Sequence, residues 1–324
     1  MMRIRAFEEA ANEASQGGVA AFGQKVGQVA KVRGPLHLSI GQEAVATGVC
    51  DHLNPTDYLT STHRGHGHTL AKGADLARMM HELFGKATGF CGGRGGSMHI
   101  ADFSVGMLGA NGVVAAGVPI AVGAAHSLKI QGKSGLAVSF FGDGAINRGP
   151  FAESLNWAAV FNLPVLFVCE DNQWSATTRT DAMSAGQGAA TRAEAHGVPA
   201  RSVDGMDVDA VWSVAAELVA DIRAGKGPRL LHADTYRFTG HVSVDPASYR
   251  DPAELAQAQT RDPIAIARER YLGAGVTEAD LLAIEQAARE EVGQAVVSAN
   301  DAPWPDESAA SSEVQDMFES GLRA

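Results

Sequence analysis

The chain has 324 residues, of which 45% are apolar and 19% charged, a composition typical of a globular protein with a large buried core. Its 26 basic and 37 acidic residues give a formal net charge of -11, which argues against a nucleic-acid partner because the sequence has no broad basic surface. The N-terminus has early arginines but then turns acidic, without the apolar core of a secretory signal, and we therefore expect a cytoplasmic protein.

From the N-terminus, residues 5–32 have the spacing of an amphipathic helix, interrupted at Gly17 and Gly18 and ending before Gly34. We treat residues 1–32 as an N-terminal helical segment. Further along, the longest apolar run, residues 113–125, is broken by Gly117 and Pro119 and is too short to cross a bilayer. The sequence therefore predicts no membrane span.

The middle of the chain alternates between strand and helix patterns. Residues 136–141 and 164–169 are short apolar runs rich in strand formers, and residues 150–161 between them have helical spacing. Residues 198–203 and 229–236 are predicted as further strands, separated by a helix over 207–224. Repeated strand–helix–strand units predict an α/β fold, a mainly parallel sheet covered by helices on both faces.

Beyond Arg250 the sequence predicts two charged amphipathic helices, over 251–272 and 277–299, the second opening with a capping Thr277. Residues 251–324 form a C-terminal helical extension in this interpretation. The sequence contains no internal repeat and no low-complexity linker, so we predict a single domain over residues 1–324. The three cysteines are far apart and lack metal-site spacing, which indicates reduced thiols.

Polar residues follow two neighbouring predicted strands. Gly142, Asp143 and Gly144 follow the first, and Asp171 and Asn172 follow the second. Ligands bind beyond the carboxyl ends of parallel strands, and Mg²⁺ prefers oxygen ligands that it shares with substrate phosphates. The pattern therefore predicts a magnesium diphosphate site, with room for the diphosphate left at Gly144. The structural alternative is an ordinary turn followed by a helix cap.

Other phosphate-binding motifs are absent. No strand is followed by Gly-x-Gly-x-x-Gly, which weakens a nicotinamide dehydrogenase interpretation, and Gly132-Lys133-Ser134 lacks the upstream glycine of a P-loop.

Five ordered blocks carry a family resemblance, together with the Gly142–Gly144 and Asp171–Asn172 signature. They are residues 37–44, 61–73, 92–99, 108–114 and 236–250: HLSIGQEA, STHRGHGHTLAKG, GGRGGSMH, LGANGVV and YRFTGHVSVDPASYR. These blocks resemble the alpha subunit of the thiamine diphosphate-dependent component of 2-oxo acid and acetoin dehydrogenase complexes. The match spans about residues 33–250 and implies the thiamine diphosphate-binding fold.

The resemblance implies a role for each matching residue. It assigns the cofactor's aminopyrimidine ring to Gly112 and Val114, and its diphosphate to His63 and Arg64, whose guanidinium can grip phosphate oxygens in pairs. Magnesium and diphosphate would bind in the signature region, with Asp143, Asn172 and the carbonyl of Trp174 as metal ligands and Gly144 and Ala145 beside the diphosphate. His37 and His241 would act as catalytic proton donors or acceptors.

The remaining motif residues have plainer interpretations. For His66, His68 and His99 a role in the site and an ordinary hydrogen-bonded or solvated role both stay open. The glycine run 92–96 is expected to pack between subunits, and Asp245 and Tyr249 to fix the loop that carries His241.

Two departures from the family pattern bear on the substrate. Asp171 replaces the usual first asparagine of an Asn-Asn pair, and His63-Arg64-Gly65-His66 replaces the Tyr-Arg-Ala-His of pyruvate-specific relatives. The second departure resembles acetoin-cleaving members. We also find no spare fixed cation in the matched blocks for a substrate carboxylate, which favours neutral acetoin over pyruvate or a branched-chain 2-oxo acid.

The resemblance implies a complete reaction and its partners. Acetoin is cleaved to acetaldehyde and a hydroxyethyl group on thiamine diphosphate, which is passed on as acetyl to lipoamide on an acyltransferase component. The cofactor needs a carboxylate from a pyrimidine-binding module that this chain lacks. We therefore expect a beta subunit that carries this module, in a two-alpha, two-beta assembly. A nicotinamide dehydrogenase and a non-catalytic scaffold subunit remain as alternatives.

Overall fold

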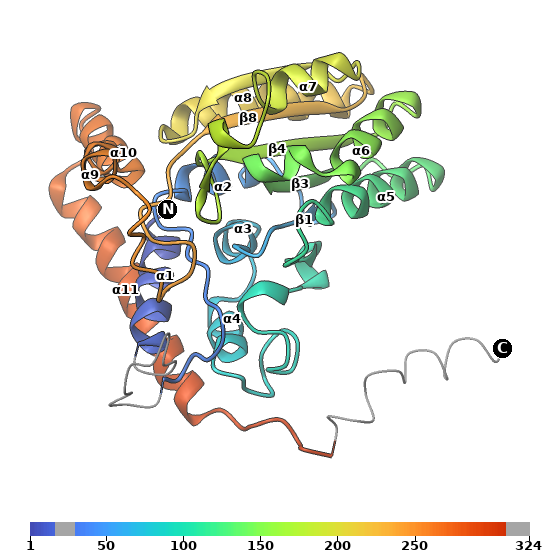
Figure 1. Cartoon of the computed structure of the whole chain (residues 1–324). Helices are drawn as coiled ribbons and strands as arrows, with labels where there is room; N and C mark the ends of the chain where they lie inside the picture. Colours follow the sequence, from blue (N-terminus) through green and yellow to red (C-terminus); the bar gives the residue numbers. More distant parts are fainter. Residues whose placement is uncertain (17–29, 309–324) are drawn as a thin grey trace.

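A six-stranded, fully parallel sheet forms the centre of the molecule (Figure 1). The computed structural model describes residues 1–16 and 30–308. The strand order is β2-β1-β3-β4-β8-β7, and β5 and β6 form a separate antiparallel pair. The strands are β1 (Tyr58–Thr60), β2 (Met107–Gly109), β3 (Ala137–Gly142), β4 (Val165–Asp171), β5 (Trp174–Ser175), β6 (Thr178–Arg179), β7 (Ala200–Asp204) and β8 (Arg229–Asp234).

Helices cover both faces of the sheet, which confirms the predicted α/β architecture. Along β4, Leu166 and Val168 face a core shared with α2 (Glu43–Cys50) and α8 (Val208–Arg223). The alternate residues Val165 and Phe167 face a second core, built with α5 (Gly117–Ile130), α6 (Gly149–Val160) and α7 (Ala189–Ala195). A strand buried on both faces reads as a continuous apolar run, as the sequence of β4 does.

The remaining helices flank this layered centre. They are α1 (Met2–Ser15), α3 (His66–Ala71), α4 (Leu76–Leu83), α9 (Pro252–Gln259), α10 (Pro263–Gly273) and α11 (Glu278–Asp301), with short 3-10 helices η2 (Ser97–His99), η3 (Phe103–Val105), η4 (Asp143–Asn147) and η5 (Thr180–Ala182). Figure 1 shows α11 running alongside α1, and Arg3 of α1 forms an ion pair of 2.6 Å with Glu291 of α11. Segments from both ends of the sequence therefore pack together.

Most predicted elements are confirmed to within a few residues, but one predicted helix is wrong. The segment 251–272 forms two helices, because Pro263 cannot continue a preceding helix and instead occupies the first turn of α10. The carboxylate of Asp262 caps α10 by accepting the N–H of Ile264 at 2.8 Å. In the N-terminal prediction, the interruption at Gly17 and Gly18 lies outside the described residues.

The apolar run over 113–125 lies largely within α5, a helix that the sequence did not predict. Among the described residues, no helix is both long and apolar enough to span a bilayer. The capping box predicted at Thr277 is confirmed, since Thr277 and Asp280 exchange side-chain and backbone hydrogen bonds.

Candidate active site

A cavity of about 340 Å³ opens at the carboxyl ends of β3 and β4. Its lining includes every site residue predicted from the sequence: His37, His63, Arg64, Gly112, Val114, Asp143, Gly144, Ala145, Asn172, Trp174 and His241. These residues come from segments more than 200 positions apart, and the fold brings all of them to one place.

The predicted oxygen ligands lie on two adjacent strand ends. Asp143 opens η4 directly after β3, and Asn172 follows β4, so the parallel β3–β4 pairing sets them side by side. The amide group of Asn172 is fixed at both ends: its oxygen accepts the N–H of Trp174 at 3.1 Å, and its nitrogen donates to Gln42 at 3.1 Å. A carboxylate, an amide oxygen and a main-chain carbonyl are therefore available to a hard cation.

Asp143 is buried at 2% exposure, and Thr180 donates a hydrogen bond to its Oδ2. Burial, together with the nearby charge of Asp171, raises the pKa of Asp143 to about 7. No basic side chain forms an ion pair with Asp143 within the described residues. The charge of Arg237 lowers the pKa of Asp143 only in part, so the ionised carboxylate is poorly stabilised without a further cation.

Gly144 lies in close contact with β5. A Cβ added at Gly144 would lie 2.3 Å from Oγ of Ser175, so the glycine is required by the close approach of β5. Room for a diphosphate at Gly144 stays a prediction.

Three histidine rings meet at one end of the cavity. The ring centroid of His37 lies 4.5 Å from that of His63 and 4.8 Å from that of His241. Burial, followed by the charge of Arg64, lowers the pKa of His37 to about 3 and that of His241 to about 4, and the same causes depress the pKa of His63. All three imidazoles are therefore neutral at pH 7 without a bound ligand.

Two buried arginines surround these rings, and one of them corrects a prediction. Arg64 donates to the carbonyls of Leu38 at 2.8 Å and His241 at 3.2 Å. Arg237 also lines the cavity, is 1% exposed, and donates to the carbonyl of Ala176 at 3.2 Å. Burial lowers the pKa of Arg64 to about 9 and that of Arg237 to about 10, which leaves both charged at pH 7.

Neither guanidinium pairs with a carboxylate among the described residues. The expectation that the matched blocks hold no spare cation is thus wrong. Arg237 lies in the block over 236–250, but the residues of this block do not indicate that its side chain points into the cavity. Buried cations without carboxylate partners indicate a site for an anionic ligand.

The loop that carries His241 is fixed by Asp245, as predicted. The Asp245 carboxylate accepts the N–H of His241 at 2.6 Å, the N–H of Ala247 at 2.9 Å and the hydroxyl of Tyr249 at 2.7 Å. These contacts set the position of the His241 ring relative to the two arginines.

The other motif histidines lie outside the cavity lining and are hydrogen-bonded. His66 contacts Glu8 at 2.9 Å, His68 contacts Glu170 at 3.0 Å, and His99 contacts the carbonyl of Gly95 at 3.0 Å. These contacts favour a structural role for all three.

The glycine-rich run has an unpredicted role within the chain. Its backbone wraps the buried carboxylate of Glu82, which accepts the N–H groups of Cys91, Gly93, Gly95 and Gly96 at 2.8–2.9 Å.

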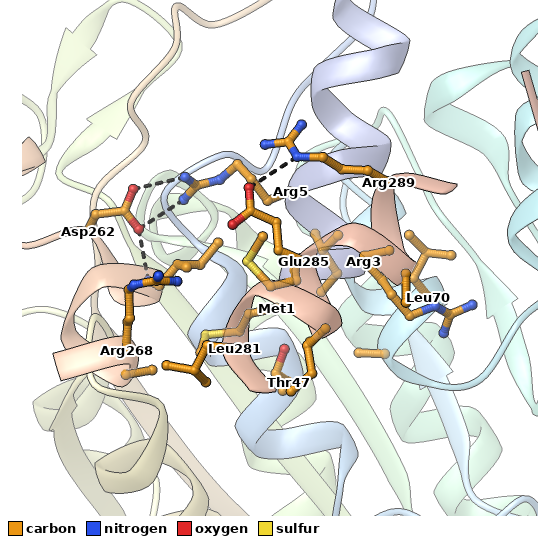
Figure 2. Close-up of a pocket in the computed structure, with 18 of the residues that line it drawn as sticks. Met1, Arg3, Arg5, Thr47, Leu70, Asp262, Arg268, Leu281, Glu285 and Arg289 are labelled. Atoms are coloured by element: carbon orange, nitrogen blue, oxygen red, sulfur yellow. Dashed lines mark hydrogen bonds and ion pairs between the residues drawn. The ribbon is translucent and has the colours of Figure 1, made fainter. Parts of the chain in front are cut away.

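A larger cavity of about 890 Å³ lies between α1, α10 and α11 (Figure 2). Several of its charged side chains form ion pairs within the cavity: Arg5 pairs with Asp262 at 2.8 Å, and Arg289 pairs with Glu285 at 3.1 Å. It contains none of the predicted site residues. We therefore place the candidate active site in the smaller cavity.

Comparisons with known proteins identify relatives of this chain. The family model of the dehydrogenase E1 component matches residues 22–308. The chain is 43% identical to the alpha subunit of acetoin:2,6-dichlorophenolindophenol oxidoreductase of Bacillus subtilis (strain 168), over 99% of this chain and 93% of the relative. The protein of the same name from Cupriavidus necator is 45% identical over 79% of this chain and 75% of its own length.

The alpha subunit of the pyruvate dehydrogenase E1 component of Zymomonas mobilis is also similar, at 38% identity over 94% of this chain and 83% of the relative.

Proposed function

The chain belongs to the dehydrogenase E1 component family, and on that premise we propose that it is the alpha subunit of an enzyme that cleaves acetoin and transfers the acetyl unit to lipoamide. One observation carries the proposal: the family blocks converge on one cavity that holds oxygen ligands, neutral histidines and unpaired arginines.

The family is thiamine diphosphate-dependent. When bound, thiamine diphosphate supplies the carbanion that attacks a carbonyl and stabilises the fragment left after carbon–carbon cleavage. In our proposal, Gly112 and Val114 hold its aminopyrimidine ring, and His63 and Arg64 bind its diphosphate. The buried guanidiniums that lack carboxylate partners support an anion at this position.

Magnesium fits the donor set at the strand ends. Asp143 would contribute a carboxylate oxygen, Asn172 its amide oxygen and Trp174 its carbonyl, with Gly144 and Ala145 lying beside the diphosphate. The raised pKa of Asp143 supports this assignment, because a cation beside the carboxylate would stabilise its charged form.

His37 and His241 would move protons at the substrate and lipoyl atoms. Their pKa values of about 3 and about 4 apply to the cavity without an anion. A diphosphate beside Arg64 would partly neutralise the charge that depresses both values, which raises them toward the pH at which imidazole exchanges protons efficiently.

An exposed apolar face supports a partner subunit. It is formed by α5 and α6, by the cavity-lining residues just before α5 and by the residue that follows α6: Val113, Val114, Ile120, Ile130, Trp157, Val160 and Phe161. A groove of about 560 Å³ runs between α5 and α6 within this face. Contiguous apolar surface of this kind is typical of an interface. We infer that a beta subunit covers it, in a two-alpha, two-beta assembly that passes acetyl groups to a lipoyl acyltransferase.

Pyruvate is the second candidate substrate, and Arg237 is the observation that favours it. A charged guanidinium in the cavity could bind a substrate carboxylate, whereas acetoin needs no such group. The case for acetoin therefore rests on the named relatives and on the HRGHGH sequence, not on the charge of the cavity.

The test is to co-express the chain with a candidate beta subunit and to assay acetoin, pyruvate and branched-chain 2-oxo acids with 2,6-dichlorophenolindophenol as electron acceptor. We expect kcat/KM for acetoin to exceed that for pyruvate by at least about tenfold, which corresponds to about 1.4 kcal/mol. A tenfold preference for pyruvate would replace acetoin as the substrate and leave the thiamine assignment intact.

A further inference from the structure

The turn that follows β4 controls two of the three proposed metal ligands. It runs from Asp171 through Asn172 and Gln173 to Trp174. Gln173 has a φ of 64°, in the left-handed region that non-glycine residues adopt rarely. Oδ1 of Asp171 accepts the N–H of Gln173 at 3.0 Å, and this contact stabilises the unusual backbone. The side chain of Asp171 thereby helps to set where Asn172 and Trp174 point.

The other carboxylate oxygen of Asp171 contacts a histidine on the neighbouring strand β8. Oδ2 of Asp171 lies 2.9 Å from Nε2 of His232, whose side chain is buried. The ring is closely packed, since a Cβ added at Gly188 would lie 2.9 Å from Cε1 of His232. The backbone at Gly188 therefore limits the movement of the ring on that side.

The surroundings of the second ring nitrogen, Nδ1, determine which tautomer of His232 is favoured. Nδ1 of His232 is buried and has no hydrogen-bond partner among the described residues. A proton on Nδ1 would be a buried donor without an acceptor, which is costly. In the neutral ring the proton therefore sits on Nε2, which donates to Asp171. This arrangement requires an acceptor at position 171.

The same turn is also connected by hydrogen bonds to Asp143, the third proposed metal ligand. The carbonyl of Gln173 accepts the N–H of Thr180 at 3.0 Å, and the hydroxyl of Thr180 donates to Oδ2 of Asp143. A continuous hydrogen-bonded path therefore runs from His232 through Asp171, Gln173 and Thr180 to Asp143. Groups that hold metal ligands in this way commonly change metal affinity by about 10- to 100-fold when they are removed.

We propose that Asp171 and His232 act as a matched pair of positioning residues that holds this turn in the geometry needed for cation binding. The inference rests on the proposed magnesium site. It explains why this chain has aspartate where the family pattern has asparagine: an asparagine NH₂ group facing His232 would force the ring proton onto the orphaned Nδ1. Asp171 and the family's asparagine are thus not interchangeable beside His232.

The test measures Mg²⁺ dependence of thiamine diphosphate binding by calorimetry on the assembled alpha–beta complex. Asp171→Asn should raise the Mg²⁺ concentration for half-maximal binding by about 10-fold or more. His232→Gln should change it by less than about twofold, because the glutamine amide still donates to Asp171. The double variant Asp171→Asn with His232→Gln should recover most of the lost affinity, since the glutamine amide can turn to accept from the asparagine.

Asp234→Asn is the matched charge control. Its carboxylate lies 3.6 Å from Nε2 of His232 and its side chain is 65% exposed, so the substitution removes a nearby negative charge and leaves the pair intact. It should bind Mg²⁺ as the wild type does. If the double variant stays as weak as Asp171→Asn, the loss is due to charge and the pairing is refuted.

A further variant of the same pair, together with thermal unfolding, separates a loss of metal binding from a loss of folding. His232→Leu removes the donor, and its Mg²⁺ requirement should also rise about 10-fold. Thermal unfolding without cofactor shows whether Asp171→Asn and His232→Leu are folded. If either of these two variants is folded and binds Mg²⁺ as the wild type does, the inference is overturned. If the wild-type complex binds thiamine diphosphate equally with and without Mg²⁺, the proposed magnesium site itself fails.

Discussion

Asp143 is placed where function and stability make opposite demands. The fold buries this carboxyl group and raises its pKa from 3.8 to about 7, so its ionised form destabilises the unliganded protein. A raised pKa contributes stability that is present below the unfolded value of 3.8 and is lost as the pH rises through about 7.

We therefore predict that Asp143→Asn lowers Mg²⁺-dependent thiamine diphosphate affinity by about 100-fold or more, because it removes the only full charge among the proposed ligands. The same variant should unfold at a higher temperature than the wild type at pH 8 without cofactor. Calorimetry and thermal unfolding measure the two effects. Unchanged cofactor affinity would contradict the metal assignment.

The histidine cluster predicts a pH dependence of the opposite sign. The pKa of His241 falls from 6.5 in the unfolded chain to about 4 in the folded protein. Protons therefore bind the unfolded state preferentially between these values, and stability present above pH 6.5 is lost as the pH falls toward 4.

His241→Asn should reduce this loss, because asparagine does not titrate. The measurement is the difference in unfolding temperature between pH 7 and pH 5 for the unliganded protein. We expect a smaller difference in His241→Asn than in the wild type, and an equal difference would show that His241 titrates normally.

At the scale of elements, Glu82 of α4 organises the loop that follows it. Its buried carboxylate accepts four backbone N–H groups, two of them from Gly93 and Gly96 at positive φ. Glu82→Gln replaces one acceptor oxygen by a donor and leaves two N–H groups unpaired, at about 1–3 kcal/mol each.

We expect Glu82→Gln to lower the free energy of unfolding by about 2–6 kcal/mol and to speed amide hydrogen exchange at residues 91–96. Glu290→Gln, on the exposed surface of α11, is the control and should change stability by less than about 0.5 kcal/mol. Wild-type exchange rates in the loop would show that the carboxylate does not hold it.

Helices and strands can be predicted from the sequence where the hydrophobic periodicity is clear. The prediction fails where a residue that usually ends a helix instead begins one. Strands β3 and β4 are continuous apolar runs bounded by polar residues, and the structure confirms both. Helix α5 was missed because Gly117 and Pro119 resemble helix breakers, although both lie in its first turn, where a proline is tolerated.

Within the candidate site, the family blocks identify which segments meet, but not where each side chain points. Arg237 and Thr180 are missed for this reason. Their directions depend on loops whose hydrogen bonds form only in the folded chain.

At the scale of the whole molecule, the apolar face on α5 and α6 predicts an obligatory partner. Val160 of α6 is 68% exposed, and Val160→Asp should prevent assembly with the beta subunit by placing a charge in the interface. Val297→Asp on α11, where the valine is 62% exposed, is the matched control and should assemble normally. Light scattering of the co-expressed proteins distinguishes the two. A wild-type chain that cleaves acetoin as a monomer would contradict the partner requirement.

The packing of α1 against α11 has a consequence for how the protein is made. The paired residues Arg3 and Glu291 are 288 positions apart, so α1 leaves the ribosome long before its partner helix has been translated. Until then the apolar side chains of α1 that face α11 have nothing to cover them on that side, which exposes the nascent chain to aggregation. Completion of the fold therefore waits for α11, and a molecular chaperone that shields α1 during synthesis would raise the yield of native protein.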